Sequence, residues 1–339
     1  MTTMQDVARH AGVSVMTVSN VINERAHVRP ATRDRVQASI SELGYHVNAT
    51  ARSLRQGRSK VIGLAVPEID RPYFGHLAAL IIDRAAVEGY EIVVEQTGAG
   101  REGELGALMH SRLRSYDGLI MSVVGLSDAD ARFLDTDVPV LLLGERDYSQ
   151  NVDQVHMANG MGGALAAEHL IAQGSRQLAM IGGSTEPARM PGAARLRADA
   201  YAAAAAAAGV PVPPSRIVDT PYTLEGGYRA MIGMWDAAGR DAPIDGVFCA
   251  TDLVAIGVIR ALRDRGLGVP DDVRVVGFDD VPLAAFLTPS LTSIAPDHQG
   301  MADAAITLLT RRISGERGPE EHEEYVARVR LIERESSRR

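Results

Sequence analysis

Side chains that could read DNA gather close to the N-terminus. Thr17 and Ser19 can donate hydrogen bonds to phosphates, and such bonds fix the register of a protein on a duplex. Asn20 can pair with the edge of an adenine, whereas Val15 and Met16 offer only apolar contacts, for example to a thymine methyl group. This mixture of phosphate-binding and base-contacting types predicts a helix that enters the major groove.

Two short helices joined by a turn are predicted to position these side chains. Residues 5–11 form the first helix, and Gly12 permits the turn because glycine adopts positive φ freely. Residues 14–23 form the second helix, with Ser14 as its N-cap. A third helix is predicted at about 32–43. The pattern is typical of a helix-turn-helix, and a three-helix module that binds protein is the alternative.

A basic segment follows the three helices. Residues 48–56 can form a further helix that carries Arg52 and Arg55 and a single apolar residue, Leu54. Basic side chains beside an isolated apolar wedge suit the minor groove. The first 60 residues hold nine Lys and Arg against four Asp and Glu, a net charge of +5, which leaves −13 for the remainder. This asymmetry indicates a nucleic-acid-binding head on an acidic body.

The composition also indicates the compartment. Cys249 is the single cysteine, so no intrachain disulfide can form, as is usual in a reducing cytoplasm. The N-terminus lacks the apolar core of a signal peptide, and no run of about 18 apolar residues predicts a membrane span. We therefore expect a cytoplasmic protein without a membrane segment.

From Val61 onward, short apolar runs alternate with helical patterns, which is typical of parallel sheets covered on both faces. There are too many strands for one sheet, which favours two similar lobes. The predicted strands are Val61–Val66, Glu91–Thr97, Gly118–Val123, Val140–Leu143, Gln177–Ile181, Gly246–Ala250 and Arg274–Phe278. The predicted helices are Phe74–Glu88, Glu102–Arg114, Gly162–Ala172, Arg195–Ala208, Leu224–Ala238, Leu253–Arg265 and Gln299–Ile313.

Polar and aromatic side chains follow several of these strands. Because ligands bind outside the carboxyl ends of parallel strands, the strand ends predict a site for a polyol. The candidates are Asp70, Tyr73, Phe74, Arg189, Arg195, Arg197, Thr251, Asp252, Asp279 and Asp280.

Structural roles are the alternative for some of the candidates. Asp252 and Asp280 could cap helices, and Arg195 could pair with an acidic residue on the surface. Tyr73 and Phe74 could be core or dimer contacts.

Other chemistry is disfavoured. Gly98–Gly103 fits the G-x-G-x-x-G pattern of NAD-binding proteins, but the ribose-binding acid should end the next strand, and Asp117 begins it. A glycine-rich turn is the favoured interpretation, and an NAD-binding enzyme is the disfavoured one. The nine histidines show no metal-ligand spacing. We predict no cofactor, no metal and no catalytic residue.

The chain resembles the lactose-repressor family of bacterial transcription regulators over nearly its whole length. The resembling strings are Gln5-Asp6-Val7-Ala8, Ala11-Gly12-Val13-Ser14, Thr17-Val18-Ser19, Val21-Ile22-Asn23 and Ala51-Arg52-Ser53-Leu54. The resemblance implies that Ala51, Leu54 and Arg55 contact the minor groove, with Leu54 as the wedge. The sequence departs from many relatives at Val15-Met16, where they have polar base readers.

For the body, the resemblance implies two lobes like those of periplasmic sugar-binding proteins and a small effector between them. It implies effector contacts at Tyr73, Phe74, Arg197, Tyr222, Thr251 and Asp279. Relatives often show Asp-Asn shortly before the Gly-Gly at 162–163, whereas this chain has Met157-Ala158-Asn159-Gly160-Met161. The effector is therefore expected to be less hydroxylated than a plain hexose.

The expected fold class is α/β, with a small all-α helix-turn-helix head and a two-lobed body. The expected domains are a head (1–46), a hinge (47–60) and a body (61–339). The first lobe is expected at about 61–158 and 292–320, and the second at about 159–291 and 321–334, with chain crossings near Ala158, Pro289–Ser293 and Pro319–Glu321.

These features predict a homodimeric repressor that binds a pseudo-palindromic operator in double-stranded DNA and is switched by a sugar-like effector. The alternative is a corepressor-dependent or activating regulator that responds to a non-sugar metabolite.

Overall fold

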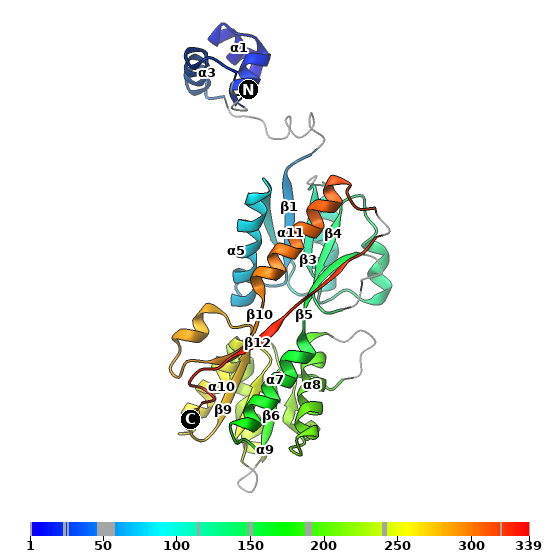
Figure 1. The fold of residues 1–339 in the computed structure, drawn as a ribbon, viewed down its shortest axis with the longest axis vertical. Coiled ribbons are helices and arrows are strands. Elements are labelled where there is room, and N and C mark those ends of the chain that lie inside the picture. Colours follow the sequence, from blue (N-terminus) through cyan, green and yellow to red (C-terminus); the bar gives the residue numbers. More distant parts are fainter. Residues whose placement is uncertain are drawn as a thin grey trace. The chain divides into compact units, whose positions relative to one another are not determined.

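The computed structural model describes residues 2–22, 25, 27–45, 58–113, 116–146, 148, 152–186, 192–238, 243–318 and 321–338. The chain divides into two compact units, Met1–Ser59 and Lys60–Arg339. The first unit is the head, and the second is the body (Figure 1). Among the described helices, none combines the length and the apolar run that a membrane span requires.

Three helices form the head: α1 (Met4–Ala11), α2 (Val15–Ile22) and α3 (Pro30–Glu42). Helix α1 begins at a capping box between Thr3 and Asp6 and ends at Gly12, whose φ of 64° confirms the predicted turn. The buried core of the head consists of Val7, Ala8, Ala11, Val18, Val21, Val36 and Tyr45.

Helix α3 begins two residues before the expected start, because proline is suited to the first position of a helix. The expected hinge helix at 48–56, with Ala51, Leu54 and Arg55, lies outside the described residues.

The body contains two six-stranded sheets, and each sheet defines one lobe. The first sheet has the order β11-β5-β4-β3-β1-β2, and the second has the order β12-β10-β9-β8-β6-β7. All of the pairings are parallel except that of β10 with β12. The strands are β1 (Val61–Val66), β2 (Glu91–Gln96), β3 (Gly118–Ser122), β4 (Val140–Leu143), β5 (Asp153–Met157), β6 (Leu178–Ile181), β7 (Ile217–Val218), β8 (Gly246–Cys249), β9 (Arg274–Phe278), β10 (Thr292–Pro296), β11 (Glu324–Ala327) and β12 (Val329–Ile332).

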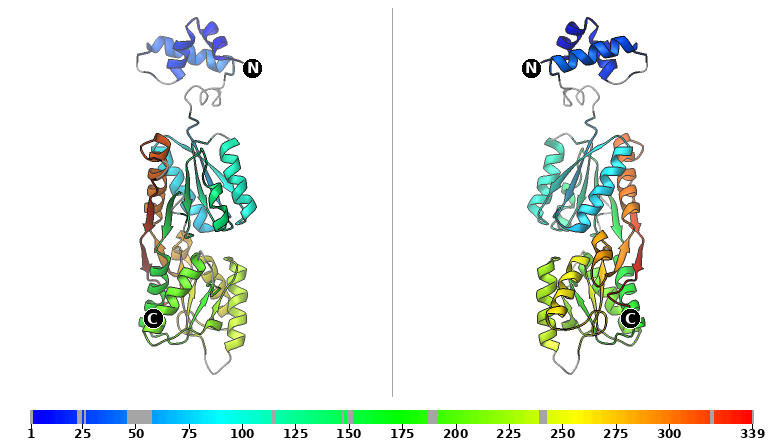
Figure 2. Two further views of the ribbon diagram at one scale, coloured as in Figure 1. Left: turned by 90° about the vertical axis from the view of Figure 1, so that its right-hand side faces the viewer. Right: turned by 90° about the vertical axis from the view of Figure 1, so that its left-hand side faces the viewer.

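Helices cover both faces of each sheet, as the side views in Figure 2 show. Helices α5 and α11 pack together against one face of the first sheet. Helix α6 packs against the other face, because successive apolar residues along β1 and β3 point to opposite faces of the sheet. In the second lobe, α7 packs with α8 and α9 packs with α10. The helices are α5 (Pro72–Val87), α6 (Arg101–Leu113), α7 (Asn159–Ala172), α8 (Ala193–Ala207), α9 (Leu224–Ala238), α10 (Asp252–Asp264) and α11 (His298–Ser314), with short 3₁₀ helices η1 (Asp128–Phe133), η2 (Pro214–Arg216) and η3 (Pro282–Phe286).

The seven predicted strands and the seven predicted body helices are confirmed, but five strands were not predicted. Strand β5 carries buried polar residues, β7 is only two residues long, and β11 is half-exposed at a sheet edge. Each of these three strands therefore lacks the apolar run by which the seven predicted strands were recognised.

Three crossings connect the lobes, and two of them lie later in the chain than expected. The first crossing is at Ala158, between β5 and α7, as predicted. The segment expected to leave the second lobe at 289–293 instead becomes β10, a strand between β9 and β12, so the chain crosses at Asp297. The third crossing is at Arg328, because β11 first joins the edge of the first sheet. The amide of Asp297 donates to the carbonyl of Arg328 at 2.9 Å, which joins the two later crossings.

Two adjacent glycines allow α7 to approach its neighbours closely. A Cβ atom at Gly163 would lie 2.3 Å from the backbone oxygen of Arg197, on α8. A Cβ atom at Gly162 would lie 2.5 Å from the ring of Phe278, at the end of β9. The Gly-Gly pair is therefore required by the packing of the second lobe.

The variant Gly163→Ala should destabilise the body by about 1–3 kcal/mol, because the added methyl group must displace the backbone of α8. The free energy of unfolding in urea measures the effect. Gly106→Ala is the matched control, since nothing lies within 4 Å of its Cβ position in α6. The control should be neutral or slightly stabilising. Equal stability of the two variants would contradict the close approach.

Candidate functional site

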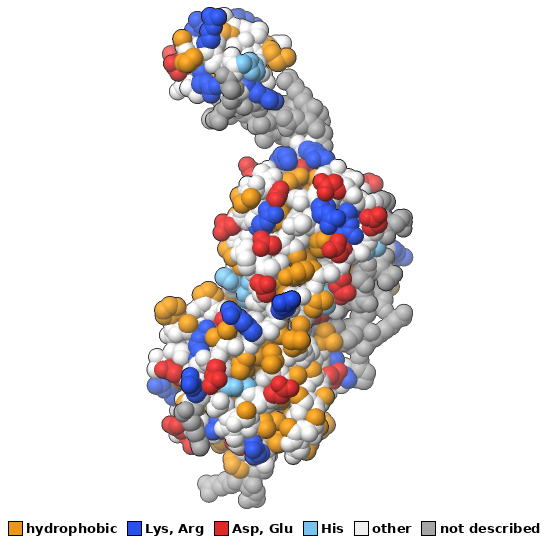
Figure 3. All heavy atoms as spheres, in the orientation of Figure 1, with side chains coloured by type: hydrophobic (Ala, Val, Ile, Leu, Met, Phe, Trp, Pro, Cys, Tyr) orange, Lys and Arg blue, Asp and Glu red, His pale blue; other side chains and the backbone are white. Residues whose placement is uncertain are grey.

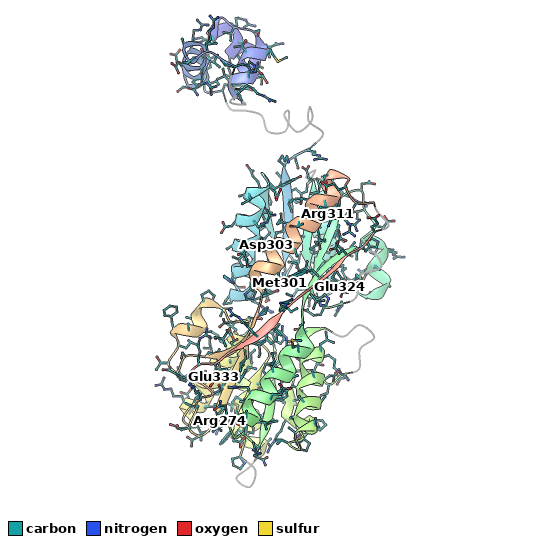
Figure 4. The ribbon with its side chains drawn as sticks, viewed as in Figure 1. Arg274, Met301, Asp303, Arg311, Glu324 and Glu333 are labelled. Atoms are coloured by element: carbon teal, nitrogen blue, oxygen red, sulfur yellow. The ribbon has the colours of Figure 1, made fainter. Side chains whose placement is uncertain are left out.

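A cavity of about 390 Å³ lies between the lobes. Its walls include Pro67 after β1, Glu145 after β4, Thr251 after β8 and Asp279 after β9, so strand ends of both sheets meet there. Figure 4 shows Met301, another lining residue, on α11 near its end toward the second lobe. The position agrees with the rule that open parallel sheets bind ligands at the carboxyl ends of their strands.

All six residues that sequence reasoning assigned to the effector line this cavity: Tyr73, Phe74, Arg197, Tyr222, Thr251 and Asp279. Tyr73 and Phe74 occupy the first turn of α5, and their ring centroids lie 4.9 Å apart in an edge-to-face arrangement. Both rings also pack against the hydrophobic core of the body, so they serve the cavity wall and the core together.

Arg197 is fixed by contacts with three neighbouring elements. Its Nε donates to Oδ1 of Asn159 at 2.6 Å, and its Nη1 donates to the backbone oxygen of Ala250. The guanidinium carbon lies 3.4 Å from the ring centroid of Phe278. Only 3% of the Arg197 side chain is exposed, so these contacts stabilise a buried charge at a defined place in the wall.

Asp279 lies on a turn that a buried carboxylate holds in place. Asp279 and Asp280 have φ values of 104° and 48°, which non-glycine residues seldom adopt. The carboxylate of Asp252 accepts from the amide of Val281 at 2.8 Å and from the hydroxyl of Ser293 at 2.5 Å. The hydroxyl of Ser293, on β10, also accepts from the amide of Asp280 at 3.0 Å, so these bonds hold the turn that carries Asp279.

Asp252 is therefore not the helix N-cap that the sequence allowed. Thr251 caps α10, because its hydroxyl accepts from the amide of Val254. Asp280 forms an ion pair with Arg334 at 2.7 Å, and Arg195 pairs with Asp199 at 2.6 Å on the surface. Arg195 thus has the surface role that the sequence allowed.

The cavity changes the acidity of its polar groups. Burial raises the pKa of Asp279 to about 7, despite the opposing charge of Arg197, and the charge of Glu145 raises it further. Burial also raises the pKa of Tyr222 to about 12 and raises that of Tyr73. Tyr222 donates its hydroxyl proton to the backbone oxygen of Gly182 at 3.1 Å. Both tyrosines are therefore neutral at neutral pH.

Sequence reasoning missed several polar residues of the wall. Glu145 and Arg146 follow β4 directly, so the strand-end rule that found Asp279 could have found them too. Asp219 follows β7, a two-residue strand that the sequence did not reveal. Asp70 and Arg195 are not among the described residues that line the cavity, and Arg189 lies outside the described residues.

The glycine-rich turn at 98–103 serves packing in the first lobe. A Cβ atom at Gly103 would lie 1.9 Å from the backbone oxygen of Thr97. The adjacent Glu104 is fully buried, and its carboxylate accepts from the amides of Val124, Gly125 and Leu126. Within the described ranges, no group of three or more His, Cys, Asp or Glu could hold a metal ion.

In the head, α2 presents the side chains that the sequence assigned to DNA. Met16 is 69% exposed and Val15 is 37% exposed, while Thr17, Ser19 and Asn20 are half-buried. The Ser14 hydroxyl accepts from the amide of Thr17 at 3.1 Å, as an N-cap does. Basic side chains are visible on the face of the head shown in Figure 3.

A three-helix head with an exposed second helix, joined in one chain to a two-lobed body with a cavity between parallel sheets, defines the class of ligand-responsive DNA-binding regulators. Comparison with known proteins supports this class. Residues 3–48 match the family model of bacterial regulatory proteins of the lacI family, and residues 167–337 match the periplasmic binding protein-like domain.

The ribose operon repressor of Escherichia coli (strain K12) is 33% identical over 319 residues, which cover 93% of this chain and 94% of that repressor. The lac repressor dimer, solved bound to operator and an anti-inducer, is 27% identical with a TM-score of 0.83 and covers 100% of this chain and 99% of its own. The transcriptional regulator CelR in complex with cellobiose is 30% identical with a TM-score of 0.73, over 99% of this chain and 100% of its own. The chain belongs to the lacI family of bacterial transcription regulators.

The raised pKa of Asp279 makes stability depend on pH. The folded protein holds this proton up to about pH 7, whereas the ordinary carboxyl loses it near 3.8. The stabilisation is therefore complete below about pH 4 and is lost as the pH rises toward 7. The free energy of unfolding should fall over this range more in the wild type than in Asp279→Asn. Burial and the charge of Asp279 also raise the pKa of Asp252, so Asp279→Asn lowers that pKa as well, and the difference reports the two coupled carboxyl groups together. Parallel pH profiles would contradict the assignment.

Proposed function

We propose that this chain is a homodimeric transcriptional repressor that binds a pseudo-palindromic operator and is switched by a small metabolite held between its lobes. The proposal rests foremost on the coupling, in one chain, of an exposed recognition helix to a cavity with a buried guanidinium and carboxyl groups. Two proteins that are similar to this chain, the transcriptional repressor PurR of Histophilus somni and the ribose operon repressor of Escherichia coli, are repressors by name.

For DNA binding, we assign the major groove to α2. Val15 and Met16 offer apolar contact to base edges, Thr17 and Ser19 bind phosphates, and Asn20 reads an adenine. The low polarity at Val15 and Met16 favours an operator in which thymine methyl groups lie under the start of the helix. We assign Ala51, Leu54 and Arg55 to the minor groove, with Leu54 as a wedge between base pairs.

For effector binding, we assign the six predicted residues to contacts with a sugar-like metabolite. Arg197 and Asp279 are suited to pairs of hydroxyl groups, and Tyr73, Phe74 and Tyr222 provide flat faces for a ring. CelR, which is similar to this chain, was solved with cellobiose. The effector stabilises one relative arrangement of the lobes, and in a repressor that is induced it must bind the operator-free state more tightly.

The body also exposes apolar side chains that suit a second copy of the chain. Val93 and Val94 are exposed on β2, the edge strand of the first sheet, and Ile82 is exposed on α5, which packs against β2. In the second lobe, Phe286 is 85% exposed on η3. Exposed apolar groups of this kind mark interaction surfaces. We propose that they meet their counterparts in a homodimer, which also explains a palindromic operator.

The proposal gives the chain no catalytic role and no cofactor, and it places the protein in the cytoplasm with its operator. An effector that strengthens operator binding would replace induction by corepression. Titration of the operator complex with the effector distinguishes these two directions.

Selection of binding sites from a random duplex library tests the DNA-binding role, because a regulator of this kind should enrich an inverted repeat. Leu54→Ala should then weaken binding to the enriched site by about tenfold or more, since the wedge that stabilises the bent duplex is lost. Fluorescence anisotropy with labelled operator measures the loss. Leu224→Ala, which shortens a half-exposed side chain on α9, is the control and should bind normally. Failure to enrich any repeat would refute the proposed function.

Asp279→Ala should abolish the effector response while operator binding is retained, because the carboxyl group lies in the cavity and not in the head. The ligand is the compound that most raises the unfolding temperature in a screen of sugars, sugar phosphates, nucleosides and aromatic acids. The response is the change in operator affinity that this compound causes. Asp236→Ala, in an exposed ion pair with Arg265, is the control. A normal response in Asp279→Ala would exclude Asp279 from the effector site.

A further inference from the structure

The cavity contains two carboxyl groups that come from opposite lobes. Glu145 follows β4 of the first sheet, and Asp279 follows β9 of the second sheet. The two groups are close enough that the charge of Glu145 contributes to the raised pKa of Asp279. The charge of Glu145 therefore makes it harder for Asp279 to remain ionised, whereas the charge of Arg197 has the opposite effect.

Neither carboxyl group is satisfied by the described part of the chain. Oε1 of Glu145 is buried and has no hydrogen-bond partner among the described residues. Asp279 is 5% exposed, and no described side chain or amide donates to its carboxylate. Buried carboxylates without donors are costly, so the geometry points to a ligand that supplies donors to both.

The arginines of the wall do not meet this need. Arg71 is paired with Glu68, and Nη1 of Arg146 donates to the backbone oxygen of Leu126. Arg197 is occupied by Asn159 and Ala250 and, within the described residues, forms no ion pair with Asp279. Asp219 adds a third carboxylate to the lining, so the acids equal the arginines in number, but within the described residues none of these arginines forms an ion pair with Glu145 or Asp279.

We propose that the effector carries a protonated amine, which binds between Glu145 and Asp279 and bridges the two lobes. This inference rests on the proposed function and narrows the class of its effector. An ammonium group brings three donors and one positive charge, so it can serve both carboxylates at once. The rings of Tyr73 and Phe74 line the same cavity and can face a cation or the apolar side of a carbon skeleton. A neutral polyol supplies donors but brings no positive charge to the two carboxyl groups.

Thermal unfolding of the full-length protein with matched compounds tests the proposal. The compounds are glucose, glucosamine and N-acetylglucosamine, together with glucitol and its 1-amino analogue. Within each set the skeleton is retained while the positive charge is added or removed. The amine of at least one set should bind tighter than its neutral counterparts by on the order of ten- to hundredfold, as hydrogen bonds to charged groups imply. Calorimetric titration of that set measures the ratio.

The variants Glu145→Gln and Asp279→Asn should each reduce the preference for the amine toward equal affinity, because each removes one of the two charges. Glu102→Gln, which alters an exposed carboxylate of the same lobe at the start of α6, is the matched control and should retain the preference. Both amide variants keep the size of the side chain, and their unfolding transitions without ligand report whether they remain folded.

The proposal would be overturned if, in both sets, the amine bound no tighter than its neutral counterparts. It would also be overturned if Glu145→Gln kept the wild-type preference for the amine. Neither result concerns DNA, because the titrations contain none. Enrichment of an inverted repeat together with an effector that is neutral would leave the proposed function intact and refute only the amine.

Discussion

The buried guanidinium of Arg197 is the interaction on which the second lobe and the cavity depend. A charge that is 3% exposed must be compensated by its surroundings, and here Asn159, Ala250 and the ring of Phe278 provide this compensation. These partners belong to α7, the end of β8 and the end of β9, so one side chain orders three elements around the cavity. Gly163 lets α7 approach the backbone at Arg197. Arg197 and its partners thus contribute both to the packing of the second lobe and to the wall of the cavity.

The turn after β9 likewise depends on a buried polar side chain. Asp252 is buried at the start of α10 and holds the amide of Val281 and the hydroxyl of Ser293. A Cβ atom at Gly277 would lie 2.3 Å from Oδ1 of Asp252, so the strand and the carboxylate depend on one another. The result is a turn with positive φ at Asp279 that aims an incompletely neutralised carboxyl group into the cavity. Strain of this kind persists only where the surroundings determine it, and it is typical of binding sites.

Three crossings join the lobes, and two of them are hydrogen-bonded to each other through Asp297 and Arg328. Met301 of α11 lies close to the crossing at Asp297, because its amide donates to the backbone oxygen of Asp297 at 2.9 Å, and it also lines the cavity. A ligand that contacts both lobes therefore acts beside the segments that must bend when the lobes move. For a regulator of the lacI family, this proximity provides a physical route from effector binding to a change in the body.

The sequence by itself determined the alternation of strands and helices and six of the residues that line the cavity. Short apolar runs revealed seven strands, of which six are buried almost throughout, whereas the edge strand β2 is largely exposed. The strand-end rule and the family resemblance together gave six residues that the structure brings to one cavity. Capping and turn preferences gave Gly12 and Ser14 in the head, because these depend only on local backbone geometry. Tertiary structure alone decided which sheet each late strand joins, since β11 pairs with β5, from the first half of the chain, whereas the next strand, β12, pairs with β10 of the other sheet. It also decided that Asp252 supports a turn and that Glu145 shares a cavity with Asp279, because these relations arise only when separate strand ends are folded together.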